Sequence, residues 1–335
     1  MEYRILGKTG LKISRLGFGG IPIQRIDAEG TKVLVHQMLE AGINYIDTAR
    51  GYTVSEEFLG YALEGIRDKV VIATKSMSRT KEAMAADIEI SLKNLRTDYI
   101  DLYQIHNATP EQLEQVMAPG GALEALQEAK AAGKIGHIGL TAHSLETFKL
   151  ALNLDWVETF MFPYNIVETQ AEKLIAECAK RNIGFIDMKP LAGGAIEDAT
   201  LALRYICAND AVTVVIPGMA EVRELEQNLA AVNATAPITN EEKAAFLEVR
   251  NQLGTNFCRR CNYCQPCAAG INISGCFLFD GYLQRYGLGE WAKGRYDAMP
   301  KHAGDCIGCG ACEARCPYNL PIRDMLKKVA ERFGH

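Results

Sequence analysis

The stretch VVIATKSMSRTKEAMAADIEISLKNLRTDYIDLYQIH, residues 70–106, contains a strand pattern, a helix pattern and a second strand pattern in that order. Its two ends, Val70–Thr74 and Leu102–His106, are short β-rich runs of the kind found in buried strands. The middle, Thr80–Leu95, has an amphipathic helical pattern. Two strands joined through a helix usually lie parallel, because the helix returns the chain to the end of the sheet at which the first strand began.

The same alternation of strand and helix patterns extends over the first 235 residues. The further strand candidates are Ile43–Asp47, Ile135–Leu140, Thr159–Phe162, Gly184–Met188 and Val212–Ile216, with a less regular one near Ser14–Phe18. The further helix candidates are Gly121–Ala132, Thr169–Lys180 and Ala220–Val232. Eight such units in about 230 residues predict an α/β fold, a closed (β/α)8 TIM barrel. An open doubly wound sheet is the alternative, although no G-x-G-x-x-G motif follows a first strand.

The overall composition limits the classes of protein to be considered. A hydrophobic content of 48% with 23% charged residues is ordinary for a soluble globular chain. The net charge of −5 argues against a nucleic-acid partner. We expect no membrane span and no secretory signal, because no apolar run has the required length. Free cysteines fit the reducing cytoplasm, which is the predicted location.

Two cysteine runs dominate the end of the chain, where nine of the 11 cysteines lie after residue 257. Cysteines at successive intervals of three let a tight loop bring several thiolates to one iron–sulfur cubane. The two runs therefore predict two [4Fe–4S] clusters, with a structural zinc site or disulfides as alternatives. The isolated Cys178 and Cys207 are interpreted as small buried hydrophobes. The cysteines of the runs are Cys258, Cys261, Cys264 and Cys267, then Cys306, Cys309, Cys312 and Cys316.

Three consecutive strand candidates end in titratable residues, Asp47, Lys75 and His106, and Tyr52 follows in the loop after the first. In a (β/α)8 barrel such residues meet at one face. A buried Lys75 ammonium would favour the Tyr52 phenolate and lower its pKa, which makes Tyr52 a usable proton donor. Asp47 would hold Lys75, and His106 could donate a hydrogen bond to a substrate carbonyl. Together these four residues predict carbonyl reduction.

These residues lie in motifs of a known family. The segments Tyr3–Ser14, Asp47–Tyr52, Ala73–Lys75 and Tyr103–His106 resemble the N-terminal hairpin, the DTA-x-x-Y motif, the lysine strand and the histidine strand of the aldo-keto reductases. The resemblance extends over residues 1–235. It implies that Asp47, Tyr52, Lys75 and His106 are the catalytic tetrad. With its tail, the chain is similar to the subgroup that carries a C-terminal ferredoxin-like domain with two clusters.

The resemblance also implies a nicotinamide cofactor, NADPH or NADH. The positions that match the family's cofactor site are altered: Thr141 takes the place of a serine, and Gly218, Met219 and Glu224 take the places of the residues that grip the 2′-phosphate. Asn228 is retained. Loss of a bidentate phosphate contact should weaken binding, so we expect no strong NADPH preference. The candidate cofactor-binding residues are Thr141, Asn165, Gly218, Met219, Arg223, Gln227 and Asn228.

Ferredoxin ligation, carried over by the resemblance, assigns the thiolates to two clusters. One would take Cys258, Cys261, Cys264 and Cys316, and the other Cys306, Cys309, Cys312 and Cys267. The short spacing before Cys267 and the absence of a proline after it leave Cys276 open as a substitute ligand. We place the barrel at residues 1–253 and a small α-rich ferredoxin-like domain at 254–335, with the junction at Gly254–Phe257. Within that domain Ile271–Ala303 is expected to be helical.

The predicted function is an oxidoreductase that acts on a small carbonyl or alcohol substrate, with clusters that pass electrons within the chain or to a redox partner protein. Hydride carries two electrons whereas each cluster carries one, so the two chemistries need a means of coupling. Two alternatives stay open: an electron-transfer protein on a repurposed barrel that does not use NAD(P)H, and an ordinary NAD(P)H reductase with structural clusters. Arg50 and Lys189 are either attractants for an anionic substrate or solvated charges.

Overall fold

The computed structural model describes residues 1–254 and 256–335 as two compact units. The first unit comprises Met1–Asn165, Thr169–Pro190 and Asp198–Ile238, and the second comprises Ile166–Glu168, Leu191–Glu197 and Thr239–His335. The second unit thus includes two short segments that follow barrel strands. Thr255, within the predicted junction, lies outside the described residues. The predicted domain boundary at residue 253 stays a prediction.

The first unit is built on a hairpin and an eight-stranded parallel sheet. The hairpin pairs β1 (Tyr3–Ile5) with β2 (Lys12–Ser14) in antiparallel register. The sheet has the order β10-β9-β8-β7-β6-β5-β4-β3 and parallel pairing throughout. Its strands are β3 (Phe18–Gly19), β4 (Tyr45–Asp47), β5 (Val71–Ser76), β6 (Ile100–Ile105), β7 (Ile135–Thr141), β8 (Thr159–Pro163), β9 (Gly184–Met188) and β10 (Val214–Ile216).

Two isolated parallel bridges bring the first and last strands of the sheet together. Leu16 pairs with Val215, and Gly19 pairs with Gly218. A side chain at Gly19 would meet the carbonyl oxygens of Ile216 and Pro217 at 2.9 Å, so glycine permits the close approach. The strands therefore form a nearly closed barrel, as the alternating pattern predicts, rather than an open sheet.

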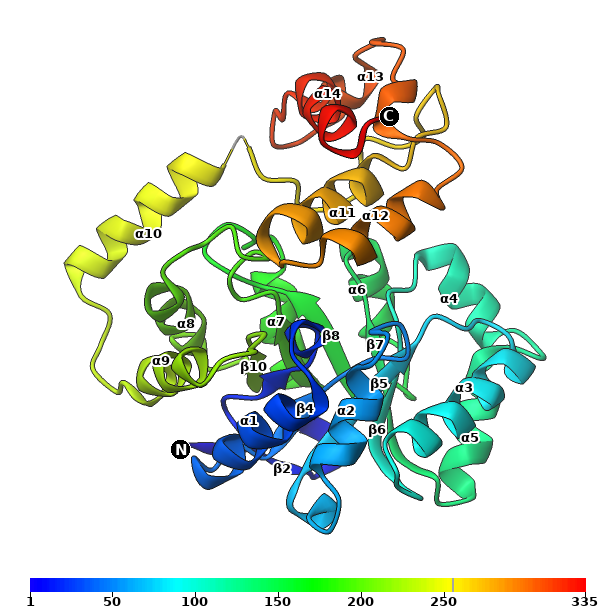
Figure 1. Cartoon of the computed structure of the whole chain (residues 1–335), viewed down its shortest axis with the longest axis vertical. Helices are drawn as coiled ribbons and strands as arrows, with labels where there is room; N and C mark the ends of the chain where they lie inside the picture. Colours follow the sequence, from blue (N-terminus) through cyan, green and yellow to red (C-terminus); the bar gives the residue numbers. More distant parts are fainter. Residues whose placement is uncertain (255) are drawn as a thin grey trace. The chain divides into compact units, whose positions relative to one another are not determined.

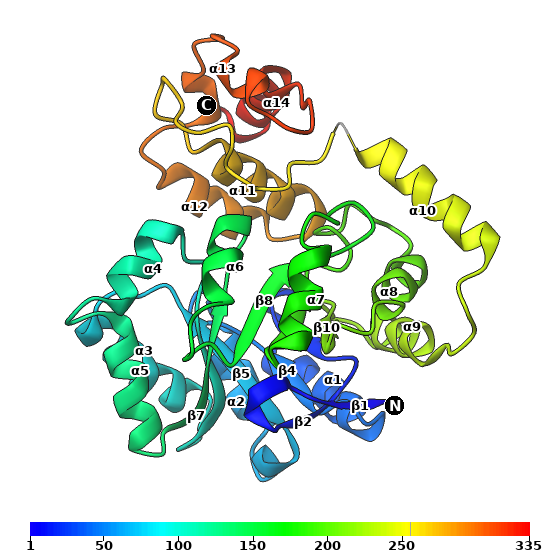
Figure 2. The ribbon, with the colours of Figure 1, turned by 180° about the vertical axis from the view of Figure 1, so that it is seen from behind.

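Helices connect successive strands and cover the outside of the barrel (Figures 1 and 2). Side-chain caps fix several helix starts: Asp27 accepts a hydrogen bond from the Gly30 N–H, and Thr109 forms a capping box with Gln112. The helices of this unit are α1 (Ala28–Glu40), α2 (Ser55–Ala62), α3 (Lys81–Asn94), α4 (Pro110–Met117), α5 (Ala122–Ala131), α6 (Leu145–Ala151), α7 (Glu172–Lys180), α8 (Ala199–Cys207) and α9 (Val222–Asn233).

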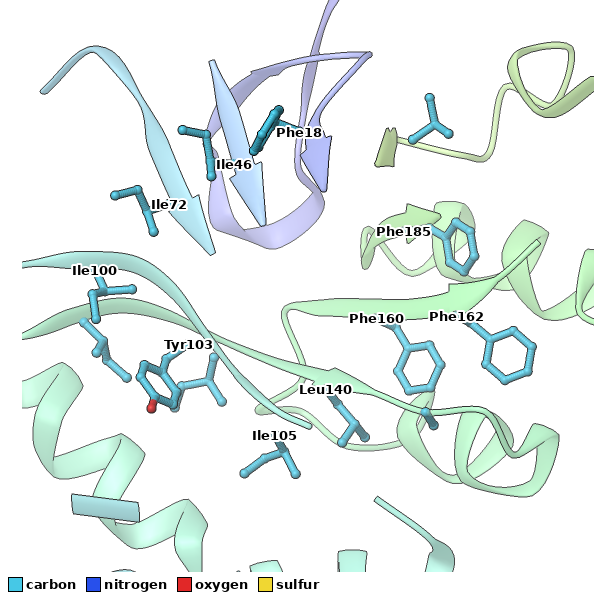
Figure 3. Close-up of a cluster of buried hydrophobic side chains, with 14 of the residues drawn as sticks. Phe18, Ile46, Ile72, Ile100, Tyr103, Ile105, Leu140, Phe160, Phe162 and Phe185 are labelled. Carbon is cyan, nitrogen blue, oxygen red and sulfur yellow. The ribbon is translucent and has the colours of Figure 1, made fainter. Parts of the chain in front are cut away.

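Side chains alternate between the inside and the outside of the barrel, as the period of two along a strand requires. Leu6 and Ile13 of the hairpin region pack with inward residues such as Tyr45, Ala73 and Leu102. Outward residues form a second core beneath the helices. There Phe148 of α6 stacks on Phe160 at 4.1 Å between ring centroids, and it lies 5.3 Å from Phe162 and 6.0 Å from Phe185; Figure 3 shows the last three of these rings.

The expected strands are present with small shifts at their ends, except at the start of the chain. There the run near Ser14–Phe18 was predicted to be one barrel strand. In the structure Lys12–Ser14 belongs to the hairpin and the barrel strand is Phe18–Gly19. The predicted strand is therefore present but shifted, with Leu16 bridged to Val215 and Phe18 paired with β4. Its start was misplaced because Ser14, Arg15 and Leu16 are all buried, so no alternation marks the change from hairpin to barrel pairing.

The second unit is mostly helical around its own core. Its helices are α10 (Asn240–Leu253), α11 (Ile273–Arg285), α12 (Gly289–Asp297), α13 (Ala311–Ala314) and α14 (Ile322–Phe333). Tyr296 of α12 stacks on Phe333 of α14 at 4.0 Å. Two hydrogen bonds of 2.5 and 2.7 Å join the Arg332 guanidinium to the Asp280 carboxylate. The expectation of helices in Ile271–Ala303 is confirmed by α11 and α12.

Within the residues that the structure describes, no helix combines the length and the apolar character that a bilayer span requires.

We predict that Phe160→Ala lowers the free energy of unfolding of the barrel by about 3–5 kcal/mol, because it removes the ring on which Phe148 stacks and leaves a cavity. Leu150→Ala on α6 is the control, since that side chain is 43% exposed and should cost under about 0.5 kcal/mol. Urea denaturation measures both. Equal losses in the two variants would contradict this account of the core.

Candidate functional site

Adjacent strands bring polar side chains into the barrel at the carboxyl ends of β4, β5 and β6. Asp47 pairs in register with Ala73, and Lys75 pairs with Gln104. Asp47 follows the inward Tyr45 by two residues, Lys75 follows Ala73, and Gln104 follows Leu102. The strand alternation therefore directs all three polar side chains into the barrel interior.

Lys75 and Asp47 form a buried ion pair. The Lys75 Nζ lies 2.5 Å from the Asp47 Oδ1 and donates a second hydrogen bond of 2.8 Å to the Thr48 carbonyl. Burial lowers the pKa of Lys75, and the Asp47 carboxylate opposes that shift. Burial likewise raises the pKa of Asp47, and Lys75 opposes it. Each charge thus offsets the desolvation of the other.

Tyr52 and His106 lie beside this pair. The Lys75 Nζ is 5.0 Å from the centroid of the Tyr52 ring. The rings of Tyr52 and His106 are 6.2 Å apart and nearly perpendicular, at 86°. Both residues are half-buried. The structure therefore brings the four residues of the predicted tetrad together, with Lys75 bonded to Asp47 and beside the Tyr52 ring.

Gln104 is a polar residue of this site that the sequence analysis did not single out. Its Nε2 donates a hydrogen bond of 3.4 Å to the Asp47 Oδ2, so both carboxylate oxygens have partners. The side chain is buried. Its place two residues before His106 on one strand was the available signal, because that spacing puts both side chains on the inward face.

Two candidate cofactor-binding residues at the ends of β7 and β8 have partners within the first unit. The Thr141 hydroxyl accepts a hydrogen bond of 2.8 Å from the Asn107 N–H, which fixes the loop after His106. The Asn165 side-chain amide donates a hydrogen bond of 3.0 Å to the Lys189 carbonyl. The oxygen of Thr141 and the amide of Asn165 are thus engaged in holding the loops at the strand ends.

The other candidate cofactor-binding residues gather around the start of α9. Met219 and Asn228 are buried, whereas Gly218, Arg223 and Gln227 are exposed. Glu224 accepts hydrogen bonds from the N–H groups of Ala220 at 2.7 Å and Glu221 at 3.1 Å, within a capping box. The Glu224 carboxylate therefore binds the two N–H groups at the start of α9 that could otherwise bind a phosphate.

Arg50 is not a solvated charge at the strand ends. Its guanidinium lies 3.1 Å from the Glu56 carboxylate and 3.5 Å from the Asp87 carboxylate. Glu56 is itself buried and accepts hydrogen bonds from Thr74 and Ser91. Arg50 therefore neutralises a buried acid, and this role competes with attraction of an anionic substrate.

Two cavities in the second unit are lined by cysteines. One is lined by Cys258, Cys261, Cys264 and Cys316. The other is lined by Cys267, Cys306, Cys309 and Cys312. Each set combines thiols from both cysteine runs, as expected where each run supplies its fourth cysteine to the other cluster. Four cysteines line each cavity, which is the number of thiolate ligands that a [4Fe–4S] cluster takes.

Cys276, the proposed substitute ligand, lines neither of these cavities. It is completely buried on α11 within the hydrophobic core of the second unit. Its place therefore matches a packing residue better than a ligand.

The first unit is a parallel barrel with an ionisable site at its strand ends, and the second unit has two cysteine-lined cavities. This combination defines the class of protein as an oxidoreductase with a redox domain. Comparison with protein families agrees with this class. Residues 15–199 match the aldo/keto reductase family, and residues 257–321 match a 4Fe-4S dicluster domain. The chain belongs to the aldo/keto reductase family.

Individual relatives share the barrel. The chain is 28% identical to L-galactose dehydrogenase of Arabidopsis thaliana over 69% of this chain and 88% of that protein. It is 33% identical to the aldo-keto reductase YhdN of Bacillus subtilis over 54% of this chain and 59% of that protein. The structure of aldo-keto reductase AKR11C1 from Bacillus halodurans in its holo form superposes with a TM-score of 0.65 at 27% identity, covering 74% of this chain and 96% of that one.

We predict that Cys267→Ala removes one of the two clusters, whereas Cys276→Ala retains both, because Cys267 lines a cysteine cavity and Cys276 does not. Iron and sulfide analysis after anaerobic reconstitution should show about half the wild-type content for the first variant, since two cubanes of equal iron content are expected. The reverse outcome would make Cys276 the eighth ligand.

Proposed function

We propose that the barrel site reduces a carbonyl, or oxidises the corresponding alcohol, with Tyr52 as the proton donor. The observation that supports this most directly is the place of the Lys75 Nζ, 5.0 Å from the Tyr52 ring centroid and paired with Asp47. A cation at that position stabilises a phenolate and so eases proton release. The substrate is a small molecule, as the aldo/keto reductase family implies.

Each residue of the site has a separate task in this proposal. Tyr52 gives its proton to the carbonyl oxygen, and the charge of Lys75 balances the phenolate that remains. Asp47 keeps Lys75 charged and in place, with Gln104 holding the far carboxylate oxygen. His106, whose ring is perpendicular to that of Tyr52, orients the substrate oxygen by a hydrogen bond.

The redox equivalents come from cofactors that the residues of each site would hold. A nicotinamide would supply hydride at the barrel, and the two [4Fe–4S] clusters would supply single electrons in the second unit. Cys309 is exposed, so a cluster held in the second cavity would be accessible to a redox partner protein. A reducing cytoplasm stays the predicted location.

The alternative is an electron-transfer protein whose barrel does not use NAD(P)H. The observation that favours it is the capping box that Glu221 and Glu224 form at the start of α9, where Glu224 takes the place of a residue that grips the 2′-phosphate. An anaerobic titration with NADH and NADPH, following nicotinamide fluorescence and cluster absorbance together, distinguishes the two. Saturable binding supports the reductase, and absence of binding of either supports the alternative.

We predict that Tyr52→Phe lowers turnover at least 100-fold, the low end for loss of a general acid, and leaves the cluster absorbance unchanged. Tyr45→Phe is the matched control. That hydroxyl is buried and has no hydrogen-bond partner among the described residues, so its loss should leave turnover near the wild-type value. Unchanged turnover in Tyr52→Phe would remove Tyr52 from the mechanism.

We predict that NADH binds more tightly than NADPH, because the carboxylates at the start of α9 repel a 2′-phosphate. Glu224→Gln keeps the capping geometry and removes one charge, so it should improve NADPH binding several-fold and change NADH binding little. Glu226→Gln, an exposed position of the same helix, is the control. An equal gain for both nucleotides would place the 2′-phosphate elsewhere.

A further inference from the structure

A buried ion pair lies next to the cavity that is lined by Cys258, Cys261, Cys264 and Cys316. The Arg260 Nη2 is 2.9 Å from the Glu168 Oε1. Only 10% of the Arg260 side chain is exposed, and none of the Glu168 side chain is. Both residues belong to the second unit, where Glu168 ends the short segment Ile166–Glu168. Charges so well shielded from water act strongly on their surroundings.

Arg260 contacts the ligand Cys258 directly. Its backbone N–H donates a hydrogen bond of 3.4 Å to the Cys258 sulfur, and its Nη1 lies 3.3 Å from the Cys258 carbonyl. The backbone of Arg260 has φ +56°, a left-handed conformation that costs free energy for a long side chain. This conformation is the one in which the Arg260 N–H group points at the Cys258 sulfur.

Both members of the pair influence the same sulfur. Arg260 places its N–H group 3.4 Å from this sulfur and its guanidinium 3.3 Å from the Cys258 carbonyl. The Glu168 carboxylate lies against the same guanidinium at 2.9 Å and so places the opposite charge nearby. The arginine therefore favours negative charge at Cys258, and the glutamate disfavours it.

Besides Arg260, two arginines fix the segment that carries Glu168. The Arg259 Nε donates a hydrogen bond of 3.3 Å to the Val167 carbonyl, and the Arg250 Nε donates one of 2.7 Å to the Ile166 carbonyl. The Arg259 guanidinium also lies 3.9 Å from the centroid of the Tyr318 ring, two residues after Cys316. The Glu168 carboxylate is therefore held near the cavity and does not depend on a mobile side chain.

We propose that Arg260 and Glu168 set the reduction potential of the cluster held by Cys258, Cys261, Cys264 and Cys316, and that they act in opposite directions. Reduction adds one electron to the cluster and so increases its negative charge. Arg260 stabilises the reduced cluster and raises its potential, while Glu168 destabilises it and lowers the potential. The inference depends on the proposed presence of a cluster in this cavity.

The second cavity has a weaker counterpart. Arg323 and Glu313 form an ion pair there at 2.8 Å, but their side chains are 50% and 23% exposed. Cys309, one of the thiols that line this cavity, is also exposed. Water screens an exposed pair, so its charges should affect a potential much less than a buried pair does. The tuning is thus specific to the first cluster.

The test is an anaerobic redox titration of the full-length reconstituted protein, monitored by electron paramagnetic resonance, in wild type and variants. Glu168→Gln should raise one of the two midpoint potentials, and Arg260→Gln should lower the same one. Glu168→Gln combined with Arg260→Gln should give a smaller shift than either change alone. Arg260→Lys, which keeps the charge, should move the potential in the direction of Arg260→Gln but less far.

Glu313→Gln makes the same chemical change beside the second cavity and should leave the first potential unchanged. Iron and sulfide content confirm that each variant retains both clusters. Shifts of the same sign for Glu168→Gln and Arg260→Gln, or no shift, would overturn the inference. If only one of the two variants folds, the direction of its shift in midpoint potential still tests the inference. Failure of the wild type to take up iron would instead contradict the proposed clusters themselves.

Discussion

The site at the barrel mouth depends on one buried ion pair. Two opposite charges inside a barrel are tolerable only if each lies close to the other and each keeps its remaining hydrogen bonds. Lys75 meets this condition through Asp47 and the Thr48 carbonyl, and Asp47 meets it through Lys75 and Gln104. Because these groups come from three adjacent strands in register, the pair forms only when the sheet is correctly assembled.

The second unit faces a different constraint, since each of its cysteine-lined cavities takes cysteines from two distant runs. Arg315 supplies part of the answer, because its guanidinium donates hydrogen bonds to the carbonyls of Cys264 at 2.8 Å and Pro266 at 2.7 Å. Arg315 immediately precedes Cys316, so these bonds bring the end of the second run to the first run. The runs themselves contain few apolar residues, and α11, α12 and α14 supply the hydrophobic core.

The features that could be predicted from the sequence are those with a local signal. Strand and helix alternation gave the barrel, and the residues at three strand ends gave the four side chains that the structure brings together. The bridge between Gly19 and Gly218 that closes the barrel and the ion-pair partners of Arg50 had no such signal, because they depend on how the chain folds. The same holds for Arg260 and Glu168, which are 92 residues apart and meet only in the folded unit.

A proton donor beside a cation serves carbonyl reduction however the electrons arrive. Hydride delivered to the carbon leaves an alkoxide that needs one proton, at the oxygen. Delivery of two single electrons needs two protons, one at the ketyl oxygen and one at the carbon. Tyr52 beside Lys75 would serve the oxygen in both routes, but the single-electron route also needs a second donor at the carbon. The start of α9 bears on the hydride route alone, since its acids oppose a phosphorylated nucleotide. Under the proposed function, binding of the nicotinamide cofactor would therefore depend on that helix rather than on Asp47, Tyr52, Lys75 and His106.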